Sequence, residues 1–537
     1  MTDKYYLKDG LYVPRKFIKG KEQELEDNFR RLIYNESGCA KCPYIEERHC
    51  AECTDCVNFL DDIRLWKKTR VNGKPYVKLP PVNRENIQDI FDLPDREIVD
   101  KRNKVPFDNK ITFTGTLRKG EVVNGQPTVN QERAVKAFLK AGGNGIMSCP
   151  ARSGKTVMAA FLTCKLGVKT LVLADQKEFL NQFYDSFAGD EKGKRKPVTS
   201  IAYEHDKSKF IRVVRKPADL RDDVKDVDIV LCNYQKFIRS KKAMRRLTSL
   251  LGDRSFVVVD EVDAAAAKAF ARVIAAIKPR YRLGLSATWE RKDNRSFILS
   301  NFIGPVVIDI KNTGLAPEIY IQETKIAFKY EYKSWVGALK ALGRNERRTE
   351  IILKLLHKDF KAGHKNIIIP VDHLEHAALL QRMINQKFGE DTARTFHGKS
   401  DSEKLLAAFD NKEFKVMIAI RRMIKRGIDL RSPTAIYMVI PMSAVPRIGA
   451  PMFYQMAYRV ATPDLNKKQP IVRLFVDNIG QSMGCFKSLF WHEIYPFSKN
   501  RKRYIIPKET YKKAQKLSKI GVRKDDGERL REVSLWG

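Results

Sequence analysis

Short apolar runs alternate with polar, helix-forming stretches over most of this 537-residue chain. In the first half the runs read GIMSC, KTLVLA, DIVLCN, SFVVVDE and RLGLSAT. Continuous apolar strands separated by helices are typical of a parallel sheet that helices cover on both faces. The pattern therefore predicts an α/β unit over residues 109–312.

The same pattern starts again further along the chain, with KNIIIPV, TARTFHG, KVMIAI, AIYMVIP and VRLFVD. It predicts a second α/β unit over residues 336–481, joined to the first by a linker over residues 313–335. A chain of this length is too long for one ordinary hydrophobic core, which agrees with several domains. Two tandem lobes of similar size are expected.

The two ends of the chain follow other patterns. In residues 1–108, KEQELEDNFRRLIY is helical in character, and two short strand patterns flank Asn72-Gly73, a strong hairpin turn signal. Residues 80–108, rich in Pro, Asn and Asp, are typical of a linker. Residues 482–537 include SKNRKRYIIPKETYKKAQKLSKIGVRK and are expected to form a basic C-terminal tail.

The chain is strongly basic, with 101 lysines and arginines against 64 acids and a formal charge of +37. This excess is spread along the chain, so it favours a polyanionic partner, most simply nucleic acid, over a well-solvated basic surface. We find no run of 18 apolar residues and no apolar signal core in MTDKYYLKDG. We therefore expect a soluble, cytoplasmic protein with no membrane partner.

The stretch CPARSGKT, residues 149–156, follows a buried strand and precedes the helical TVMAAFLTCKL. Backbone N–H groups at such a strand-to-helix loop bind phosphate. Lys155 would reach the β- and γ-phosphates, Thr156 would bind Mg²⁺, and Gly154 would let the backbone approach the anion. Cys149 replaces the usual first glycine. The loop residues expected to contact ATP are Arg152, Ser153, Gly154, Lys155 and Thr156.

A second motif, SFVVVDEVD over residues 255–263, places two acids at the end of a buried strand. Ligands bind at the carboxyl ends of strands in such sheets. Asp260 would hold Mg²⁺ and Glu261 would polarise the attacking water. An isolated acid pair at a strand end often makes surface hydrogen bonds instead, but its place after a phosphate loop favours an ATPase.

In this order, RSGKT, VVVDEVD and GLSATWERKDNRS resemble the superfamily 2 helicases and translocases. Residues 284–296 are similar to the segment that couples ATP to movement in the branch containing the phage UvsW helicase, XPB and restriction-enzyme motors, although Trp289 stands where proline is usual. The resemblance covers residues 110–480 and implies two RecA-like lobes that share one ATP. It also suggests a phage origin and therefore the cytoplasm of a bacterial host.

Further residues match this family one by one, and their roles are implied by the resemblance. Gln131 would read the adenine edge, and Arg459 would act as an arginine finger beside Gln455 at the γ-phosphate. The remaining matches are Ser286, Ala287 and Thr288 for coupling, and Gly427 and Asp429 in the second-lobe ATP motif. Two positions depart from the family, because Arg421 replaces a Thr or Ser and Thr462 replaces a second arginine.

Five of the nine cysteines lie in CAKCPYIEERHCAECTDC. Two C-x-x-C pairs suit a tetrahedral structural Zn²⁺ site in an intracellular chain. The expected ligands are Cys39, Cys42, Cys53 and Cys56, with Cys50 or His49 as competitors. An iron–sulfur cluster is the alternative. Beside the basic hairpin, this small module would either grip nucleic acid or brace the first lobe.

These features predict an ATP-dependent DNA helicase or translocase that acts on forked, branched or single-stranded DNA, with ATP, Mg²⁺ and Zn²⁺ as cofactors. DNA is favoured over RNA by analogy alone. The alternatives are an RNA helicase, the motor of a restriction system, and a nucleic-acid-binding scaffold without enzymatic activity.

Overall fold

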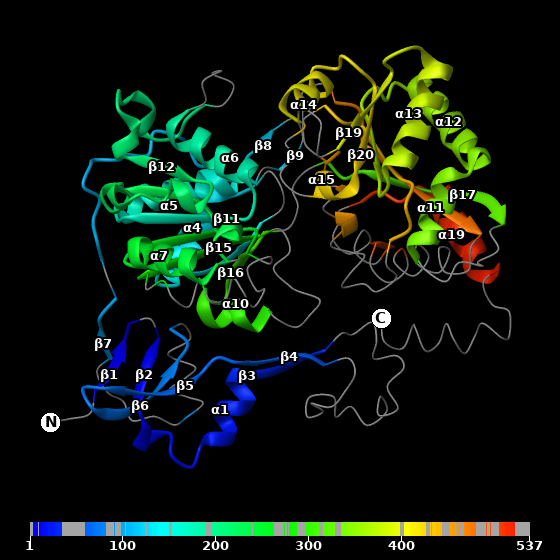
Figure 1. Ribbon diagram of the computed structural model, residues 1–537. Coiled ribbons are helices and arrows are strands. Elements are labelled where there is room, and N and C mark those ends of the chain that lie inside the picture. Colours follow the sequence, from blue (N-terminus) through cyan, green and yellow to red (C-terminus); the bar gives the residue numbers. More distant parts are fainter. Residues whose placement is uncertain are drawn as a thin grey trace. The chain divides into compact units, whose positions relative to one another are not determined.

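The structure is a computed structural model of the chain. It describes residues 4–8, 10–34, 59–81, 91, 98–102, 104–123, 126–127, 129–149, 153–189, 196–238, 240–262, 273, 277, 279–286, 296–310, 315–327, 335–397, 402–425, 430, 432–442, 452–454, 456–457, 459–461, 467–478, 490, 494–495 and 504–520. They form two compact units, residues 1–121 with 128–311 and residues 122–127 with 312–537. Figure 1 shows the helices and strands of each.

The first unit begins with a five-stranded sheet of order β5-β6-β2-β1-β7. Its strands are β1 Tyr5–Leu7, β2 Leu11–Pro14, β5 Lys67–Val71, β6 Lys74–Leu79 and β7 Ile98–Asp100. The predicted hairpin is confirmed, since β5 pairs with β6 across Asn72 and Gly73, both at positive φ. Two further strands, β3 Arg30–Tyr34 and β4 Phe59–Arg64, form a separate antiparallel pair (Figure 1).

One face of this N-terminal sheet is a small hydrophobic core. Leu25 and Phe29 of α1, Glu22–Phe29, pack there with Leu7, Leu11 and Val77. The helical pattern expected through residue 34 ends at Phe29, where the chain turns extended into β3. The stretch expected to be a linker contains β7, which pairs in parallel with β1. Residues 80–108 therefore contribute a strand to the sheet, because the apolar IVD run gains backbone hydrogen bonds there.

The second sheet of this unit has seven parallel strands among the described residues, in the order β12-β13-β11-β14-β15-β10-β16. They are β10 Asn144–Ser148, β11 Thr170–Ala174, β12 Ile211–Val214, β13 Ile229–Asn233, β14 Phe256–Asp260, β15 Tyr281–Ser286 and β16 Val306–Asp309. Its helices are α4 Gln131–Lys140, α5 Lys155–Leu166, α6 Lys177–Ala188, α7 Lys241–Leu251 and α10 Ser296–Phe302. Short 3₁₀ turns, η3 Ser200–Tyr203 through η7 Tyr234–Lys236, connect the outer strands.

Helices cover both faces of the seven-stranded sheet, as the apolar runs predict. Phe138 of α4, Leu162 of α5 and Phe183 of α6 pack on one face. On the opposite face, α7 and α10 contribute Leu247 and Leu299. Because the central strands lie between two apolar layers, alternation disappears and these strands are buried throughout their length.

The second unit is built on a six-stranded parallel sheet in the order β17-β22-β21-β18-β20-β19. Its strands are β17 Glu318–Ala327, β18 Ile367–Val371, β19 Ala393–Phe396, β20 Val416–Ile420, β21 Ala435–Met438 and β22 Ile471–Asn478. Its helices are α11 Trp335–Arg344, α12 Glu346–Lys361, α13 Leu374–Phe388, α14 Ser402–Asp410, α15 Arg421–Lys425 and α19 Lys508–Ile520. The short hairpin of β8 Val122–Val123 and β9 Gln126–Pro127 groups with this unit.

Two stretches expected to lie outside the second α/β unit are packed into it, one in its sheet and one in its core. β17 occupies much of the expected linker 313–335 and pairs in parallel with β22. Within the expected basic tail, Phe490, Ile494 and, in α19, Ala514 are buried in the main core of this unit. The apolar residues of this stretch are separated by basic ones, so its overall charge does not indicate that one face packs against the core. Residues 521–537 lie outside the described residues.

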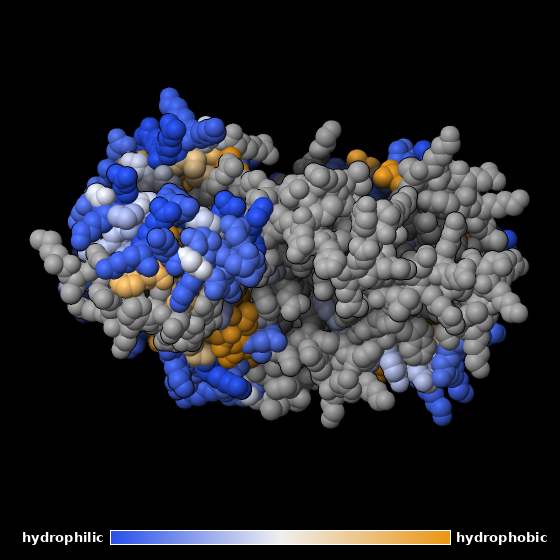
Figure 2. All heavy atoms as spheres, turned by 90° about the horizontal axis from the view of Figure 1, so that it is seen from below, coloured by the Kyte–Doolittle hydropathy of each residue, from blue (hydrophilic) through white to orange (hydrophobic). Residues whose placement is uncertain are grey.

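The surface agrees with the polar composition of the chain. Figure 2 shows that hydrophilic residues make up most of the coloured surface on one face of the molecule, with a few hydrophobic patches among them. None of the helices in the described part of the chain is both long and apolar enough to cross a bilayer.

Candidate nucleotide-binding site

The phosphate-binding motif occupies the position that its sequence context predicts, between β10 and α5. Gly154 is the N-terminal cap of α5 and has a left-handed backbone, with φ of +81°. A Cβ built there would lie 2.1 Å from the Nε2 of Gln131, so a side chain would strain the backbone and displace the Gln131 amide. Lys155 and Thr156 form the first turn of α5. The N–H groups of this turn, aligned with the helix dipole, suit an anion.

Gln131 supports this loop through two hydrogen bonds. It is 2% exposed and begins α4, which Asn130 caps by accepting a hydrogen bond from the backbone N–H of Arg133. Gln131 Nε2 donates to the backbone oxygen of Ser153 at 2.9 Å, and its Oε1 accepts from the N–H of Arg118 at 3.0 Å. The amide therefore ties α4 to the loop, and its contact with adenine stays a prediction.

The acid pair lies at the carboxyl edge of the same sheet, where β14 ends. Asp260 is the last residue of β14, and Glu261 follows in a left-handed conformation with φ of +48°. This backbone conformation is rare for a residue with a Cβ. The Nζ of Lys155 lies 3.7 Å from Oε1 of Glu261, and their side chains are 13% and 19% exposed. The structure thus brings the two motifs together.

Burial and the neighbouring charge of Glu261 together raise the pKa of Asp260 to about 7, while Lys155 opposes the shift. Asp175, directly after β11, contributes a further negative field. A cluster of buried carboxylates with one ammonium is short of positive charge. A divalent cation bound together with a nucleotide would supply the missing positive charge and keep Asp260 ionised.

The strand ends next to the loop are tied together by hydrogen bonds. Ser286, at the end of β15, lies opposite Ser148 of β10, and its carbonyl accepts from the N–H of Cys149 at 2.8 Å. The hydroxyl of Ser148 donates to Oδ1 of Asp309 at 2.8 Å, at the end of β16. The ends of β10, β15 and β16 are therefore joined where the phosphate loop begins.

Asp175 and Asp309 are members of this site that the motifs do not identify. Both end short apolar runs, TLVLAD and VVID, as Asp260 does in VVVD. An acid at the end of an apolar run can be recognised in the sequence. Only the order of the strands in the sheet shows that Asp175 and Asp309 lie close to the phosphate loop. Cys149 lies among them and is buried; burial raises the pKa of its thiol to about 12, so it is an uncharged packing residue.

In the second unit, Arg459 closes a short turn in which its N–H donates to the carbonyl of Met456. Arg421, at the start of α15, pairs through its Nε with Oδ1 of Asp372 at 2.8 Å, directly after β18. Its Nη1 also donates to the sulfur of Met452. A position that usually holds a small hydroxyl therefore carries an ion pair that joins two strand ends.

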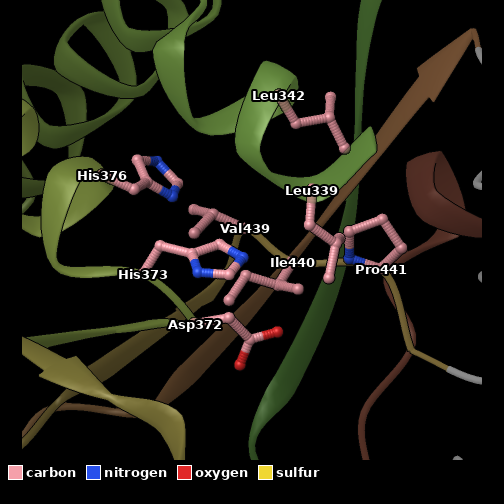
Figure 3. A pocket seen from close by; sticks show the side chains of 8 residues that line it. All are labelled: Leu339, Leu342, Asp372, His373, His376, Val439, Ile440 and Pro441. Carbon is pink, nitrogen blue, oxygen red and sulfur yellow. The ribbon is translucent and has the colours of Figure 1, made fainter. Parts of the chain in front are cut away.

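Asp372 also lines a small pocket in this unit, with His373, His376 and the two leucines of α11. In the view of Figure 3, Leu339 and Leu342 lie to the right of His373 and His376. Its lining holds an acid but no lysine or arginine, so it does not suit the phosphates of a nucleotide.

Several predicted site residues lie outside the described residues. They are Arg152, Ala287, Thr288, Gly427, Asp429, Gln455 and the whole cysteine cluster with Cys39, Cys42, His49, Cys50, Cys53 and Cys56. Within the residues that are described, no group of three His, Cys, Asp or Glu side chains is arranged to hold a metal ion. The predicted zinc ligands are not among these residues, so the zinc site stays a prediction.

Residues 124–291 match the family model described as "Type III restriction enzyme, res subunit". The chain is 24% identical over 290 residues to "Putative helicase 161L" of Invertebrate iridescent virus 6, covering 53% of this chain and 60% of that protein. It is 20% identical over 380 residues to "Putative ATP-dependent RNA helicase L396" of Acanthamoeba polyphaga mimivirus, covering 68% and 65%. It is 30% identical over 179 residues to "DNA 3'-5' helicase XPB" of Mycobacterium tuberculosis, covering 33% and 29%.

These matches confirm the resemblance to superfamily 2 helicases and translocases of the branch that contains XPB and restriction-enzyme motors. The chain spans about three fifths of the length of the first curated relatives that it matches.

Proposed function

We propose that this chain is an ATP-dependent DNA helicase or translocase. Residues 109–312 and 336–481 act as RecA-like lobes that share one ATP. The observation that carries the proposal is the approach of Lys155 to Glu261 at the carboxyl edge of the first parallel sheet. A lysine from a phosphate loop and an acid from the end of another strand of the same sheet are the parts that ATP hydrolysis needs at one place.

The chemistry of the first lobe follows from these groups. The N–H groups at the start of α5 and the Lys155 ammonium bind the phosphate tail, and in doing so Lys155 leaves Glu261. The freed carboxylate then orients a water for attack on the γ-phosphate. The hydrogen bond from Gln131 to the backbone oxygen of Ser153 keeps the loop in the conformation that binds the phosphates.

Thr156 and Asp260 would hold Mg²⁺, which would neutralise charge on the phosphates when bound. The shortage of positive charge around Asp260, which raises its pKa, supports this assignment. Arg459 is proposed as the finger that the second lobe adds, with Gln455 beside it. Gly427 and Asp429 are proposed to contact the nucleotide in the closed state. Ser286, Ala287 and Thr288 are proposed to pass closure to the phosphate loop, since the carbonyl of Ser286 holds the N–H of Cys149.

Alternating closure and opening of the two lobes, driven by contacts to the γ-phosphate, would move the protein along a nucleic-acid strand. The charge of +37 supplies the attraction for the phosphate backbone. We propose DNA because the segment 284–296 resembles DNA-remodelling relatives. An RNA helicase is the second candidate, because L396 carries that description.

One experiment separates these candidates. ATP turnover is measured with single-stranded DNA, branched DNA, duplex DNA and RNA at one ionic strength, because salt alone changes affinity strongly. The proposal expects DNA to stimulate turnover more than RNA does. Stronger stimulation by RNA supports the second candidate. Stimulation of ATP turnover by duplex DNA and by no other nucleic acid supports a restriction-type motor. A chain without ATP turnover is a binding scaffold.

The cysteine cluster stays a proposal for a structural Zn²⁺ or an iron–sulfur cluster. Metal analysis of the purified chain, with its absorption spectrum, distinguishes the two. If the module grips nucleic acid, chelation abolishes fork binding. If it braces the first lobe, chelation lowers only the melting temperature.

A further inference from the structure

One face of the N-terminal sheet carries an ordered row of aromatic and basic residues. The strand registers pair Tyr6 with Tyr12, Tyr12 with Lys78, and Lys78 with Lys67. Directly paired residues of neighbouring strands point to the same face of a sheet. One row across four strands therefore reads Tyr6, Tyr12, Lys78 and Lys67.

This face lies opposite the small hydrophobic core. Lys67 and Lys74 are exposed on it, whereas Pro14 and Tyr76 are buried. The core residues Tyr5, Leu7, Leu11, Val13 and Val77 alternate with members of the row along the same strands, so they occupy the opposite face. Tyr6 and Tyr12 are partly exposed and Lys67 is exposed, whereas Tyr5 and Leu11 are each 1% exposed. Tyr6 and Tyr12 thus reach the surface, whereas Tyr5 on the opposite face does not.

Positive charge surrounds the two rings. The Nζ of Lys101 lies 4.6 Å from the ring centroid of Tyr6, and the Nζ of Lys78 lies 5.7 Å from that of Tyr12. Beyond the row, β6 adds the exposed Lys74 to this face. Among the described strand residues of this face, which are Tyr6, Tyr12, Pro14, Lys67, Thr69, Val71, Lys74, Tyr76, Lys78 and Val99, none is acidic.

Tyr76 holds Tyr6 in place from the side. Their ring centroids are 6.0 Å apart, and the Tyr76 hydroxyl donates to the backbone oxygen of Lys4 at 3.3 Å. Tyr76 is 3% exposed, so it acts as a fixed support. A ring held in this way loses little conformational freedom when a flat partner stacks on it.

We propose that the face formed by Tyr6, Tyr12, Lys67, Lys78 and Lys101, here called the tyrosine-lysine face, binds single-stranded nucleic acid. Unpaired bases stack on Tyr6 and Tyr12, and the lysines pair with the phosphates between them. This inference rests on the proposed function in one respect, since it takes nucleic acid to be the polyanion that the chain moves on. It adds a site outside the two lobes.

The strand must be single because a base in a duplex already has neighbours on both faces and cannot offer one to a tyrosine. Base stacking on an aromatic ring is stronger than an exposed contact between a lysine and a ring. Lys78 and Lys101 are therefore expected to leave the ring faces and turn to phosphates when a base arrives. Stacking tolerates any sequence, which suits a protein that travels along a strand.

The test measures binding of a fluorescent oligothymidine to the full chain by anisotropy, across a range of salt concentrations. The stacking variant is Tyr6→Leu with Tyr12→Leu, which keeps an apolar surface. The charge variant is Lys67→Gln with Lys78→Gln. The control is Tyr203→Leu, because Tyr203 is a 76% exposed tyrosine on the first lobe. Melting temperature and ATP turnover without nucleic acid report whether each variant is folded.

We expect the stacking variant to weaken binding about tenfold or more, with an unchanged slope of affinity against salt. The charge variant should lower that slope by about 0.7 for each phosphate that a lysine no longer neutralises. Tyr6→Phe with Tyr12→Phe should bind like the wild type, because the ring is retained. Basal ATP turnover should be unchanged in every folded variant.

Wild-type affinity in the stacking variant, or an equal loss in Tyr203→Leu, would overturn the inference. An equal loss for duplex and single strand would also overturn it, since that outcome belongs to charge alone. If the stacking variant unfolds, Tyr12→Leu alone and Tyr12→Phe repeat the comparison on one ring. The proposed function fails by a different result, the absence of ATP turnover in the wild type.

Discussion

Lys155 and Glu261 face each other across the end of the first parallel sheet, with 3.7 Å between the Nζ and Oε1 atoms. Lys155 follows β10 and Glu261 follows β14, and these two strands are not neighbours because β15 lies between them. The left-handed backbone at Glu261 and the cap at Gly154 accompany this approach. The ion pair lies where the proposed function places the γ-phosphate.

The first prediction concerns Glu261→Gln. The amide retains the size of the side chain but cannot orient a water as a base does, so ATP turnover should fall by about a hundredfold or more. Nucleotide binding should be equal or tighter, because Lys155 no longer has an ionic partner to leave. Steady-state turnover and binding of a fluorescent ATP analogue measure the two effects. Glu204→Gln, at an exposed position of the same unit, serves as the control. Parallel losses in binding and turnover would contradict the assigned role.

The second prediction concerns Gly154→Ala. The new Cβ would lie 2.1 Å from Gln131 Nε2 at a backbone φ of +81°, so the Gln131 amide must move and the loop loses its hydrogen bond at Ser153. Nucleotide affinity should fall about tenfold or more, since several N–H groups are displaced together. Gly142→Ala is the matched control, because its φ is +70° and nothing lies within 4 Å of the added Cβ. It should lose about 1 kcal/mol of stability from backbone strain and keep full affinity. Equal affinity in the two variants would show that contact with Gln131 is unimportant.

The third prediction concerns Arg459→Ala. An arginine finger stabilises charge that develops in the transition state, so the variant should lose about a thousandfold in kcat while nucleotide affinity changes little. Turnover at saturating ATP, together with the dissociation constant for ADP, separates these effects. Arg421→Ala breaks the ion pair to Asp372. It is expected to lower the free energy of unfolding while kcat changes little. If Arg459→Ala lost binding and turnover equally, the finger would have to be another residue.

The strands of the first lobe show how far the sequence allowed prediction. All five apolar runs became strands, and they are β10, β11, β13, β14 and β15 at the centre of the sheet. The two strands that the pattern missed, β12 and β16, are its edges. Edge strands contact fewer neighbours, and β16 is only half-buried, so their sequences need not be continuously apolar. β17, the edge of the second sheet, was hidden in the expected linker for the same reason.

The candidate site divides in a similar way. Residues from Ser153 to Thr156 and the pair Asp260-Glu261 are contiguous in sequence, and each set has a local geometry that a motif encodes. Asp175 and Asp309 reach the site only through the order of the strands, which depends on long-range packing that no local pattern contains. The tyrosine-lysine face was equally hidden, because its residues share a face only through the register of neighbouring strands.

The fourth prediction concerns pH and the second unit. Burial lowers the pKa of His376 to about 3, with the charges of Arg348 and His373 acting in the same direction. His376 is therefore neutral when folded, and protonation favours the unfolded chain, whose histidine has a pKa near 6.5. The protonation of His376 therefore leaves the free energy of unfolding unaffected above pH 6.5, and this free energy decreases as the pH falls from 6.5 toward 3. Between pH 6.5 and pH 5 this loss amounts to about 2 kcal/mol.

Urea unfolding at pH 7 and pH 5 measures this dependence in the wild type and in His376→Gln. The variant should be less stable at pH 7 but should show a smaller difference between the two pH values. His357→Gln, at an exposed position of α12, is the control and should keep the wild-type difference. If His376→Gln and the wild type responded to pH identically, another group would be responsible.

The fifth prediction tests the central claim that one triphosphate is bound and hydrolysed at the Lys155 and Glu261 edge in response to nucleic acid. The measurement is ATP turnover of the full chain with and without single-stranded and branched DNA, beside the Lys155→Ala variant. We expect DNA to stimulate turnover in the wild type, and we expect Lys155→Ala to lower turnover to background while its melting temperature is retained. Turnover that is equal in the two proteins, or wild-type turnover that no nucleic acid changes, would contradict the account.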